Sequence, residues 1–169
     1  MNPILLGGLL IGGLCSTWIV INGLTGFYKD PQMSAMFVPI VSFMEIVVLI
    51  WALRKTAALG RSYSGQVVAG SFMALIGGAI NFCTSVVFTS VFYPNYFAEI
   101  NAMSRQVMLE NKQSEEQIAS AINAVAGWQT PAMAALAGFI GTVMTGIIAS
   151  AVIAIWIRAR DVDRPTAGA

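Results

Sequence analysis

The chain has 169 residues, of which 57% are hydrophobic and 10% are charged, and its formal net charge is +1. Soluble domains carry about 25% charged residues, so this composition places the chain among integral membrane proteins. The small net charge gives no indication of nucleic-acid binding, and the absence of histidine excludes histidine-ligated haem or zinc and the usual general base.

Four apolar segments are long enough to cross a membrane as helices, which requires about 20 residues. The predicted spans cover about residues 3–26, 36–53, 65–92 and 131–157. Pro39 falls in the first turns of the second predicted span, where amides lack helical partners and proline is tolerated. The predicted fold class is therefore all-α: a polytopic four-helix transmembrane bundle that forms a single integral membrane domain over residues 1–169.

Residues 94–129 form the one sizeable polar region, and their pattern predicts an amphipathic helical hairpin between the third and fourth spans. Ser114 and Gln117 have the spacing of a capping box, which predicts the start of the second hairpin helix. The candidate docking surface of this hairpin consists of Tyr96, Ile100, Met103, Val107, Ile118 and Ile122. The hairpin either rests on the membrane surface or the ends of the spans, or docks another protein.

Basic residues are concentrated on one side of the predicted spans. Arg54, Lys55 and Arg61 lie between the second and third spans, and three more arginines lie in residues 158–169. The connections on the opposite side carry fewer basic and more acidic residues. The positive-inside rule therefore predicts cytoplasmic termini, a cytoplasmic tail over residues 158–169 and an extracytoplasmic hairpin.

Glu45 is the one charged residue inside the four predicted spans, and it lies near the middle of the second. A charge at that depth costs about 2.5–3.5 kcal/mol on insertion scales, and lipid offers no hydrogen-bond partner. We therefore expect Glu45 to be protonated and to hydrogen-bond Asn81. The candidate polar layer at this depth consists of Glu45, Asn81, Thr145, Ser42 and Cys15. Either this layer joins the helices by hydrogen bonds, or Glu45 is a proton or cation site.

Small residues repeat at every fourth position on three of the predicted spans. The candidate helix-packing faces consist of Gly8, Gly12, Ala74, Gly78, Ala134, Gly138, Thr142 and Gly146. Such faces let helix backbones approach closely. They predict packing within the bundle, and the same pattern is typical of self-association and of binding to a larger membrane complex.

The sequence carries no motif of a known reaction. It has no phosphate-binding glycine loop and no Ser–His–Asp or Cys–His arrangement, and its hairpin carboxylates are typical of a solvated face. Cys15 and Cys83 fall within apolar segments without the spacing of a metal site or a disulfide framework. The sequence therefore predicts a protein that is not an enzyme and that has no cofactor and no metal.

Three stretches of the chain carry a resemblance to a known family. They are the basic loop at 53–66 that leads into the third span, the aromatic-rich exit of that span at 91–99, and Pro131 at the start of a last span rich in Gly, Ile and Ala. Together they resemble a bacterial four-span membrane family catalogued only as domain of unknown function 4199. The resemblance implies a protein of the bacterial cytoplasmic (inner) membrane with this hairpin topology, and it implies no activity.

Two hypotheses about function follow. The sequence favours a non-enzymatic accessory or scaffold subunit that lies in the lipid bilayer and binds other membrane subunits, or itself, through its small-residue faces and hairpin. The alternative is a small proton-coupled transporter that acts as an oligomer, with Glu45 as the proton or cation site. In layout alone, a lone glutamate in a four-span chain resembles the small multidrug-resistance exporters, in which one acidic residue exchanges protons for a cationic substrate.

Overall fold

The computed structural model describes residues 2–161, and all the regular elements in this range are helical, which confirms the all-α prediction. The elements in chain order are α1 (Pro3–Thr25), the short helix η1 (Phe27–Lys29), α2 (Pro31–Ala57), α3 (Tyr63–Val87), the π-helical turn η2 (Phe88–Phe92), α4 (Tyr96–Glu110), α5 (Glu115–Ala126) and α6 (Pro131–Asp161). Helix α6 thus continues through 158–161, the first part of the predicted cytoplasmic tail. The rest of that tail, residues 162–169, lies outside the described residues.

Four helical segments are long and apolar enough to cross a membrane: α1, α2, α3 continued by η2, and α6. Many of their large apolar side chains are exposed on the surface of the bundle, among them Phe43, Phe72 and Ile148. In water such a surface would be costly, whereas lipid chains solvate it. The structure therefore agrees with a four-span membrane protein.

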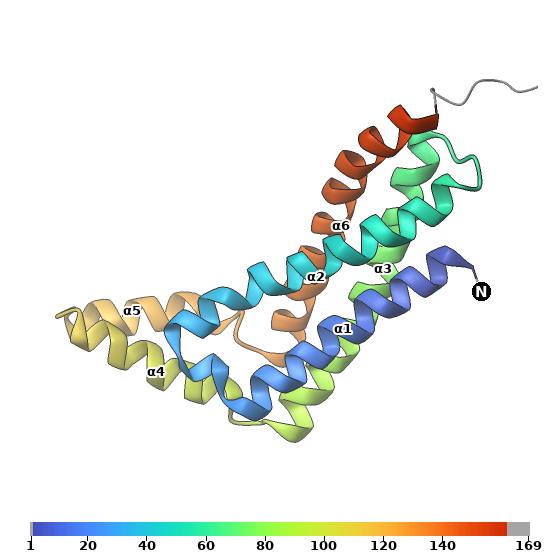
Figure 1. The fold of residues 1–169 in the computed structure, drawn as a ribbon. Coiled ribbons are helices and arrows are strands. Elements are labelled where there is room, and N and C mark those ends of the chain that lie inside the picture. The colour runs from blue at the N-terminus through green and yellow to red at the C-terminus, as the bar shows by residue number, and fades with distance from the viewer. Residues whose placement is uncertain (1, 162–169) are drawn as a thin grey trace, which may run out of the picture.

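The third span lies at the centre of the bundle, because α3 packs along both α1 and α6, while α2 packs mainly against α1 and α6. Figure 1 shows the start of α1, the α2–α3 loop and the end of α6 on one side of the molecule. We call this side the basic-loop end, because Arg54, Lys55 and Arg61 lie there. The α4–α5 pair projects from the opposite side, which we call the hairpin end (Figure 1).

Helix α2 begins five residues before the predicted start of the second span. The side chain of Asp30 accepts hydrogen bonds from the amides of Gln32 and Met33, and Pro31 occupies the first helical position, where proline is favoured. Pro39 consequently lies inside the helix and not in its first turns, so the prediction for this residue was wrong. Its ring removes one amide donor from the middle of the helix.

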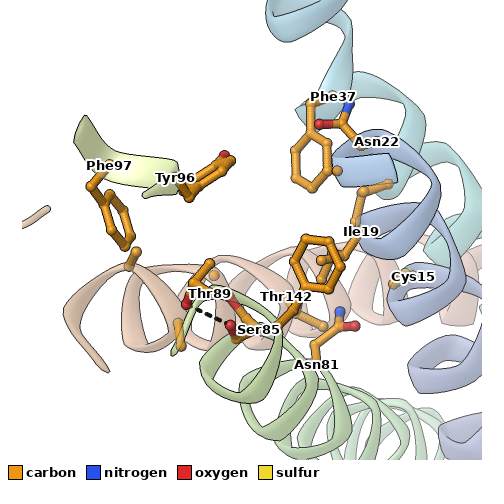
Figure 2. Close-up of a pocket in the computed structure, with 16 residues that line it drawn as sticks. Cys15, Ile19, Asn22, Phe37, Asn81, Ser85, Thr89, Tyr96, Phe97 and Thr142 are labelled. Atoms are coloured by element: carbon orange, nitrogen blue, oxygen red, sulfur yellow. Dashed lines mark hydrogen bonds between the residues drawn. The ribbon is translucent and has the colours of Figure 1, made fainter. Parts of the chain in front are cut away.

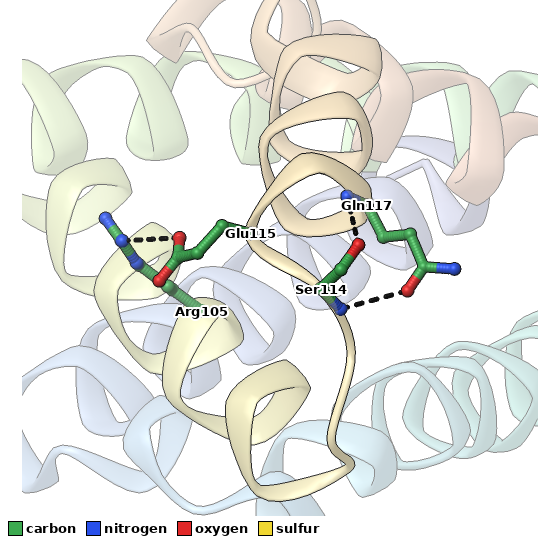
Figure 3. Close-up of polar contacts among 4 residues, drawn as sticks. All are labelled: Arg105, Ser114, Glu115 and Gln117. Atoms are coloured by element: carbon green, nitrogen blue, oxygen red, sulfur yellow. Dashed lines mark hydrogen bonds and ion pairs between the residues drawn. The ribbon is translucent and has the colours of Figure 1, made fainter.

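The α4–α5 hairpin matches the predicted hairpin in position and in its capping. The Ser114 hydroxyl accepts a hydrogen bond from the backbone amide of Gln117, and the side-chain oxygen of Gln117 accepts one from the backbone amide of Ser114 (Figure 3). The predicted capping box is therefore confirmed. Arg105 and Glu115 form an ion pair across the turn at 2.8 Å (Figure 3). Ile118 is buried, so it is unavailable to the docking surface on which it was placed.

The remaining candidate docking residues do not form one continuous exposed face. Ile100, Met103 and Ile122 are half-buried, and Val107 is exposed. Tyr96 lines a pocket described below. The hairpin therefore uses part of its apolar surface to join its own two helices. The sequence pattern alone could not distinguish these residues from residues that bind a partner.

The predicted small-residue face of α1 lies against α3. A Cβ atom built on Gly8 would lie 2.6 Å from Cβ of Ile76, and one built on Gly12 would lie 2.7 Å from Cβ of Ile80. Real Cβ atoms do not approach so closely, so these two glycines allow the backbones of α1 and α3 to pack.

The predicted face of α6 is only partly in contact with α3. A Cβ atom on Gly146 would overlap Cβ of Ala74, and one on Gly78 would lie 3.0 Å from the Phe139 ring. Gly138 is exposed and would meet nothing within 4 Å, so its assignment to a packing face was wrong. Gly138 instead lines a pocket that is described below.

Candidate functional site

A pocket of about 220 Å³ lies between the four spans in the half of the bundle nearest the hairpin. Its lining comes from α1, α2, α3, η2, α4 and α6, and Figure 2 shows the labelled side chains around it. The lining residues are Cys15, Ile19, Asn22, Gly23, Phe37, Val41, Asn81, Ser85, Phe88, Thr89, Tyr96, Phe97, Ala134, Ala135, Gly138 and Thr142. We call it the hairpin-side pocket.

The two halves of the bundle differ in how they are filled. Toward the basic-loop end, large side chains such as Ile11, Leu49 and Met73 form a continuous buried core. Toward the hairpin end, the small residues Ala134 and Gly138 of α6 face the pocket instead of a neighbouring helix. The small stripe of α6 therefore has two roles along its length: helix contact near Gly146 and pocket lining nearer the hairpin.

Aromatic rings cover much of the pocket wall. Phe37 and Asn22 lie on one side of it, and Tyr96 and Phe97 of α4 lie on the opposite side (Figure 2). Phe88 belongs to the π-helical turn, in which the Tyr93 amide donates to the Phe88 carbonyl at 2.8 Å. π-Helical turns are rare and are often found at functional sites. Apolar walls with a few polar groups are typical of small-molecule sites.

The polar groups of the pocket include Cys15, Asn81 and Thr142, which we call its polar end. The Asn81 Oδ1 atom accepts a hydrogen bond from the Ser16 hydroxyl at 3.1 Å. Asn22 is 6% exposed, and its Nδ2 atom has no hydrogen-bond partner within the described residues. A buried polar donor without a partner is uncommon and needs an explanation, such as a bound ligand or water.

Glu45 lies beside the polar end and outside the pocket lining. On α2 it follows Phe37 and Val41 at intervals of four residues, so it continues their face one turn deeper. Its side chain is 1% exposed and its Oε1 atom has no partner within the described residues. The absent side chain of Gly146 makes room for this carboxyl, because a Cβ atom there would lie 2.9 Å from Oε1.

The predicted polar layer is only partly present in the structure. The expected hydrogen bond between Glu45 and Asn81 is not formed, and the Oδ1 atom of Asn81 accepts a hydrogen bond from the Ser16 hydroxyl. The threonine of α6 that lies at the polar end of the pocket is Thr142, which is buried. Thr145 is half-buried and lies outside the pocket lining. Ser42 is also half-buried outside the lining, and Cys15 lies at the polar end as the layer required.

Sequence reasoning missed three buried polar residues closer to the basic-loop end: Ser150, Thr56 and Gln66. Ser150 is fully buried against Gly70, and its hydroxyl has no partner within residues 2–161. Thr56 donates a hydrogen bond to Oε1 of the buried Gln66. Gln66 and Ser150 lie on predicted spans, and Thr56 lies three residues beyond the predicted end of the second span. The spacing of Gly146 and Ser150 on α6 was the available signal.

A cluster of polar contacts joins the hairpin to η1 near the pocket. The Tyr28 hydroxyl donates to Glu99 Oε2 at 2.6 Å, and the Lys29 ammonium lies 2.8 Å from the same oxygen. The Tyr28 ring also packs on Tyr96, with ring centroids 5.0 Å apart. We call Tyr28, Lys29 and Glu99 the Glu99 cluster. It holds the part of α4 that carries the pocket residues Tyr96 and Phe97.

The charges of the Glu99 cluster stabilise one another. The hydrogen bond from Lys29, with that from Tyr28, lowers the pKa of Glu99, and the same carboxylate raises the pKa of Lys29. Burial, with the hydrogen bond to Glu99, raises the pKa of Tyr28 to about 12. Because the pKa of Glu99 is lowered in the folded state, its interactions stabilise the fold at pH values above 4.5, the ordinary pKa of a glutamate. Because the pKa of Lys29 is raised, its interactions stabilise the fold at pH values below 10.5, the ordinary pKa of a lysine. The cluster is therefore fully formed across the physiological pH range and weakens on acidification below 4.5.

We expect Glu99→Gln to increase amide hydrogen exchange in α4, because the variant loses the charge that Lys29 pairs with. Exposed ion pairs contribute little, so the increase should be at most about fivefold. Hydrogen-exchange mass spectrometry of the protein in detergent measures it, with Glu110→Gln at the far end of the same helix as the matched control. Equal exchange in the two variants would contradict the stabilising role of the cluster.

Comparison with known proteins identifies a family for most of the chain. The family model described as Protein of unknown function (DUF4199) matches residues 7–159. No curated protein and no solved structure matches the chain. The match agrees with the resemblance seen in the basic loop, in the exit of the third span and at Pro131.

Proposed function

We propose that this chain, which belongs to the DUF4199 family of proteins of unknown function, is a small, non-enzymatic, proton-coupled transporter. It would bind a small molecule in the hairpin-side pocket. One observation carries the proposal: the buried carboxyl of Glu45, with an unpaired oxygen, lies one helical turn from a pocket bounded by all four spans. An ionisable residue at such a depth is a candidate functional group by default.

The packing around Glu45 favours this proposal over a purely structural role. A carboxyl that joins helices would be expected to form hydrogen bonds, because those bonds are its contribution to stability. Glu45 instead faces the backbone of Gly146, and its Oε1 atom has no partner among the residues that the structure describes. Proton exchange at Glu45 would change the charge directly beside the pocket.

The proposal includes an orientation in a bacterial cytoplasmic membrane. The basic residues Arg54, Lys55 and Arg61 lie at the basic-loop end, and the ammonium of Lys55 lies 4.0 Å from the centre of the Trp51 ring. A tryptophan paired with a lysine is typical of a membrane interface. This end is therefore cytoplasmic, and the hairpin and the pocket face the outside.

Proton movement in phospholipid vesicles tests the proposal. Purified protein is reconstituted with a trapped pH-sensitive dye, a pH gradient is imposed, and small amphipathic compounds are added one at a time. We expect at least one compound to accelerate collapse of the gradient relative to protein-free vesicles. A panel in which no compound does so would contradict proton coupling.

A second candidate function is an accessory subunit of a larger membrane complex. The observation that favours it is the hairpin itself, which contacts the rest of the protein mainly through α4 and η1 and exposes Leu109, Val125 and Trp128. Affinity purification of tagged protein from its own membrane in mild detergent, followed by native mass spectrometry, separates the two functions. A stoichiometric larger partner supports the subunit, and a chain without a partner supports the transporter.

A further inference from the structure

We propose that the α4–α5 hairpin is a lid on the hairpin-side pocket, and that the Glu99 cluster is the latch that holds this lid closed. This inference rests on the proposed function in one respect, because it takes the pocket as the binding site of the transporter. The hairpin forms a wall of the pocket, packs weakly on the spans, and is held to them by one polar cluster.

The first turn of α4 supplies one wall of the pocket. Tyr96 and Phe97 line it together with residues of the four spans. Figure 2 shows these two rings across the pocket from Phe37 of α2 and Asn22 of α1. Because the spans supply the other walls, a movement of α4 away from the spans would remove this side and open the pocket toward the hairpin end.

The hairpin packs weakly on the rest of the protein. No residue of α4 is buried, and Ile118 is the one buried residue of α5. Apart from their contact with each other, the two helices lie mainly against the short helix η1. Helix α3, by contrast, has buried residues from Gln66 to Asn81. Segments with few buried contacts open at a lower free energy than the core of a protein, and the lids of ligand sites belong to this class.

Two short connections join the hairpin to the spans and would act as its hinges. Residues 93–95 follow the π-helical turn, and residues 127–130 lead into α6. A Cβ atom built on Gly127 would meet nothing within 4 Å, so neighbouring side chains do not confine the second connection at this residue. The ion pair between Arg105 and Glu115 joins the two hairpin helices. The hairpin can therefore turn as one unit, with the backbone change absorbed at the ends of its helices.

The Glu99 cluster fixes the end of the hairpin that forms the pocket wall. The carboxylate of Glu99 accepts a hydrogen bond from the Tyr28 hydroxyl at 2.6 Å and lies 2.8 Å from the Lys29 ammonium. In the part of the chain that the structure describes, these are the side-chain hydrogen bond and the ion pair that join the hairpin to another element. Glu99 follows Tyr96 by one helical turn, so the cluster holds the turn that carries Tyr96 and Phe97.

The latch is weak enough to be released repeatedly. The side chains of Lys29 and Glu99 are 60% and 38% exposed, so water competes for both charges. Exposed ion pairs stabilise a contact only slightly, so the loss of this one should change the balance between closed and open lid by at most about fivefold. Such a balance suits a lid that opens and closes in every transport cycle.

A cysteine inside the pocket measures how often the lid opens. Ser85 lines the pocket and is half-buried, so Ser85→Cys is made in full-length protein in which the native Cys15 and Cys83 are replaced by alanine. A permanently charged methanethiosulfonate reagent approaches from water, so its rate of reaction with this thiol reports aqueous access to the pocket. We expect Glu99→Gln to raise the rate about two- to fivefold and Glu110→Gln, at the far end of α4, to leave it unchanged. Equal rates in the two variants would overturn the latch.

The partner of Glu99 is tested by a double-mutant cycle. Lys29→Gln should also raise the labelling rate of Ser85→Cys, because it removes the same ion pair. The double variant Lys29→Gln with Glu99→Gln should react no faster than the faster of the two single variants, since the pair is lost only once. Effects that multiply would show that the two residues act separately, and would overturn the pair as the latch.

A reversible lock tests the movement itself. The chain has no histidine, so Lys29→His with Glu99→His creates a two-histidine nickel site across the latch on a clean background. Nickel that binds only the closed lid should slow labelling of Ser85→Cys about tenfold or more, and a chelator should restore the rate. The protein without the two histidines is the control. Nickel that is bound by calorimetry but leaves the labelling rate unchanged would overturn the lid.

The lid and the transport function fail separately in these experiments. Labelling that follows the latch variants and the nickel lock, with no compound that moves protons in vesicles, would retain the lid and reject transport. Proton movement in vesicles, with labelling that ignores the latch variants, would retain transport and overturn the lid.

Discussion

Gly146→Val should lower the free energy of unfolding by about 3 kcal/mol or more, the upper part of the range for overpacked cores. The Cβ atom alone would overlap Cβ of Ala74 and lie 2.9 Å from the Glu45 carboxyl. The Ala74 atom is attached directly to the α3 backbone, so no side-chain rotation relieves the overlap. Helix α6 would have to move away from α3, along the most extensive contact in the bundle.

Unfolding in mixed detergent and dodecyl sulfate micelles measures this loss. Gly141→Val is the matched control, because Gly141 lies on the same helix, is exposed, and has nothing within 4 Å of a Cβ atom. Substitutions at such surface positions usually stay within about 0.5 kcal/mol. A similar loss in both variants would show that valine itself, and not the contact with α3, destabilises α6.

The four spans could be predicted from the sequence because their signal is local. An apolar run of sufficient length forms a helix in lipid whatever its neighbours are, and the capping box at Ser114 and Gln117 is decided within four residues. The start of α2 was missed even though its signal is also local. The Asp30 side chain accepts hydrogen bonds from two of the first amides of that helix, and Pro31 has no amide hydrogen that needs a partner. The helix therefore begins before the apolar run.

The site could not be predicted in the same way, because it depends on how each helix is rotated about its axis. Thr142 and Thr145 are three residues apart on α6, and packing on α3 decides which of them is buried. The period-four stripe on α6 was visible in the sequence, but the sequence did not show that Gly138 lines a pocket and is not packed against a neighbouring helix. Ser16, on a different span, donates to Asn81, and only the tertiary arrangement shows that this pair forms.

Glu45→Gln should reduce compound-dependent proton movement in vesicles to the level of protein-free vesicles. Glutamine keeps the shape of the side chain and fits beside Gly146, but it cannot bind and release a proton. We expect the protein to remain folded, because Glu45 Oε1 makes no hydrogen bond that the substitution would remove. The unfolding temperature of the variant checks this expectation before the vesicle assay is run.

The matched control for this variant is Glu116→Gln, which removes the same formal charge from an exposed position of α5. Any loss caused by the change in net charge should appear in both variants, whereas loss of a proton site should appear only in Glu45→Gln. Full proton movement in Glu45→Gln would show that the carboxyl does not carry the proton. In that case the unpaired oxygen beside Gly146 would be a feature of packing, and the accessory function would be the better explanation of the fold.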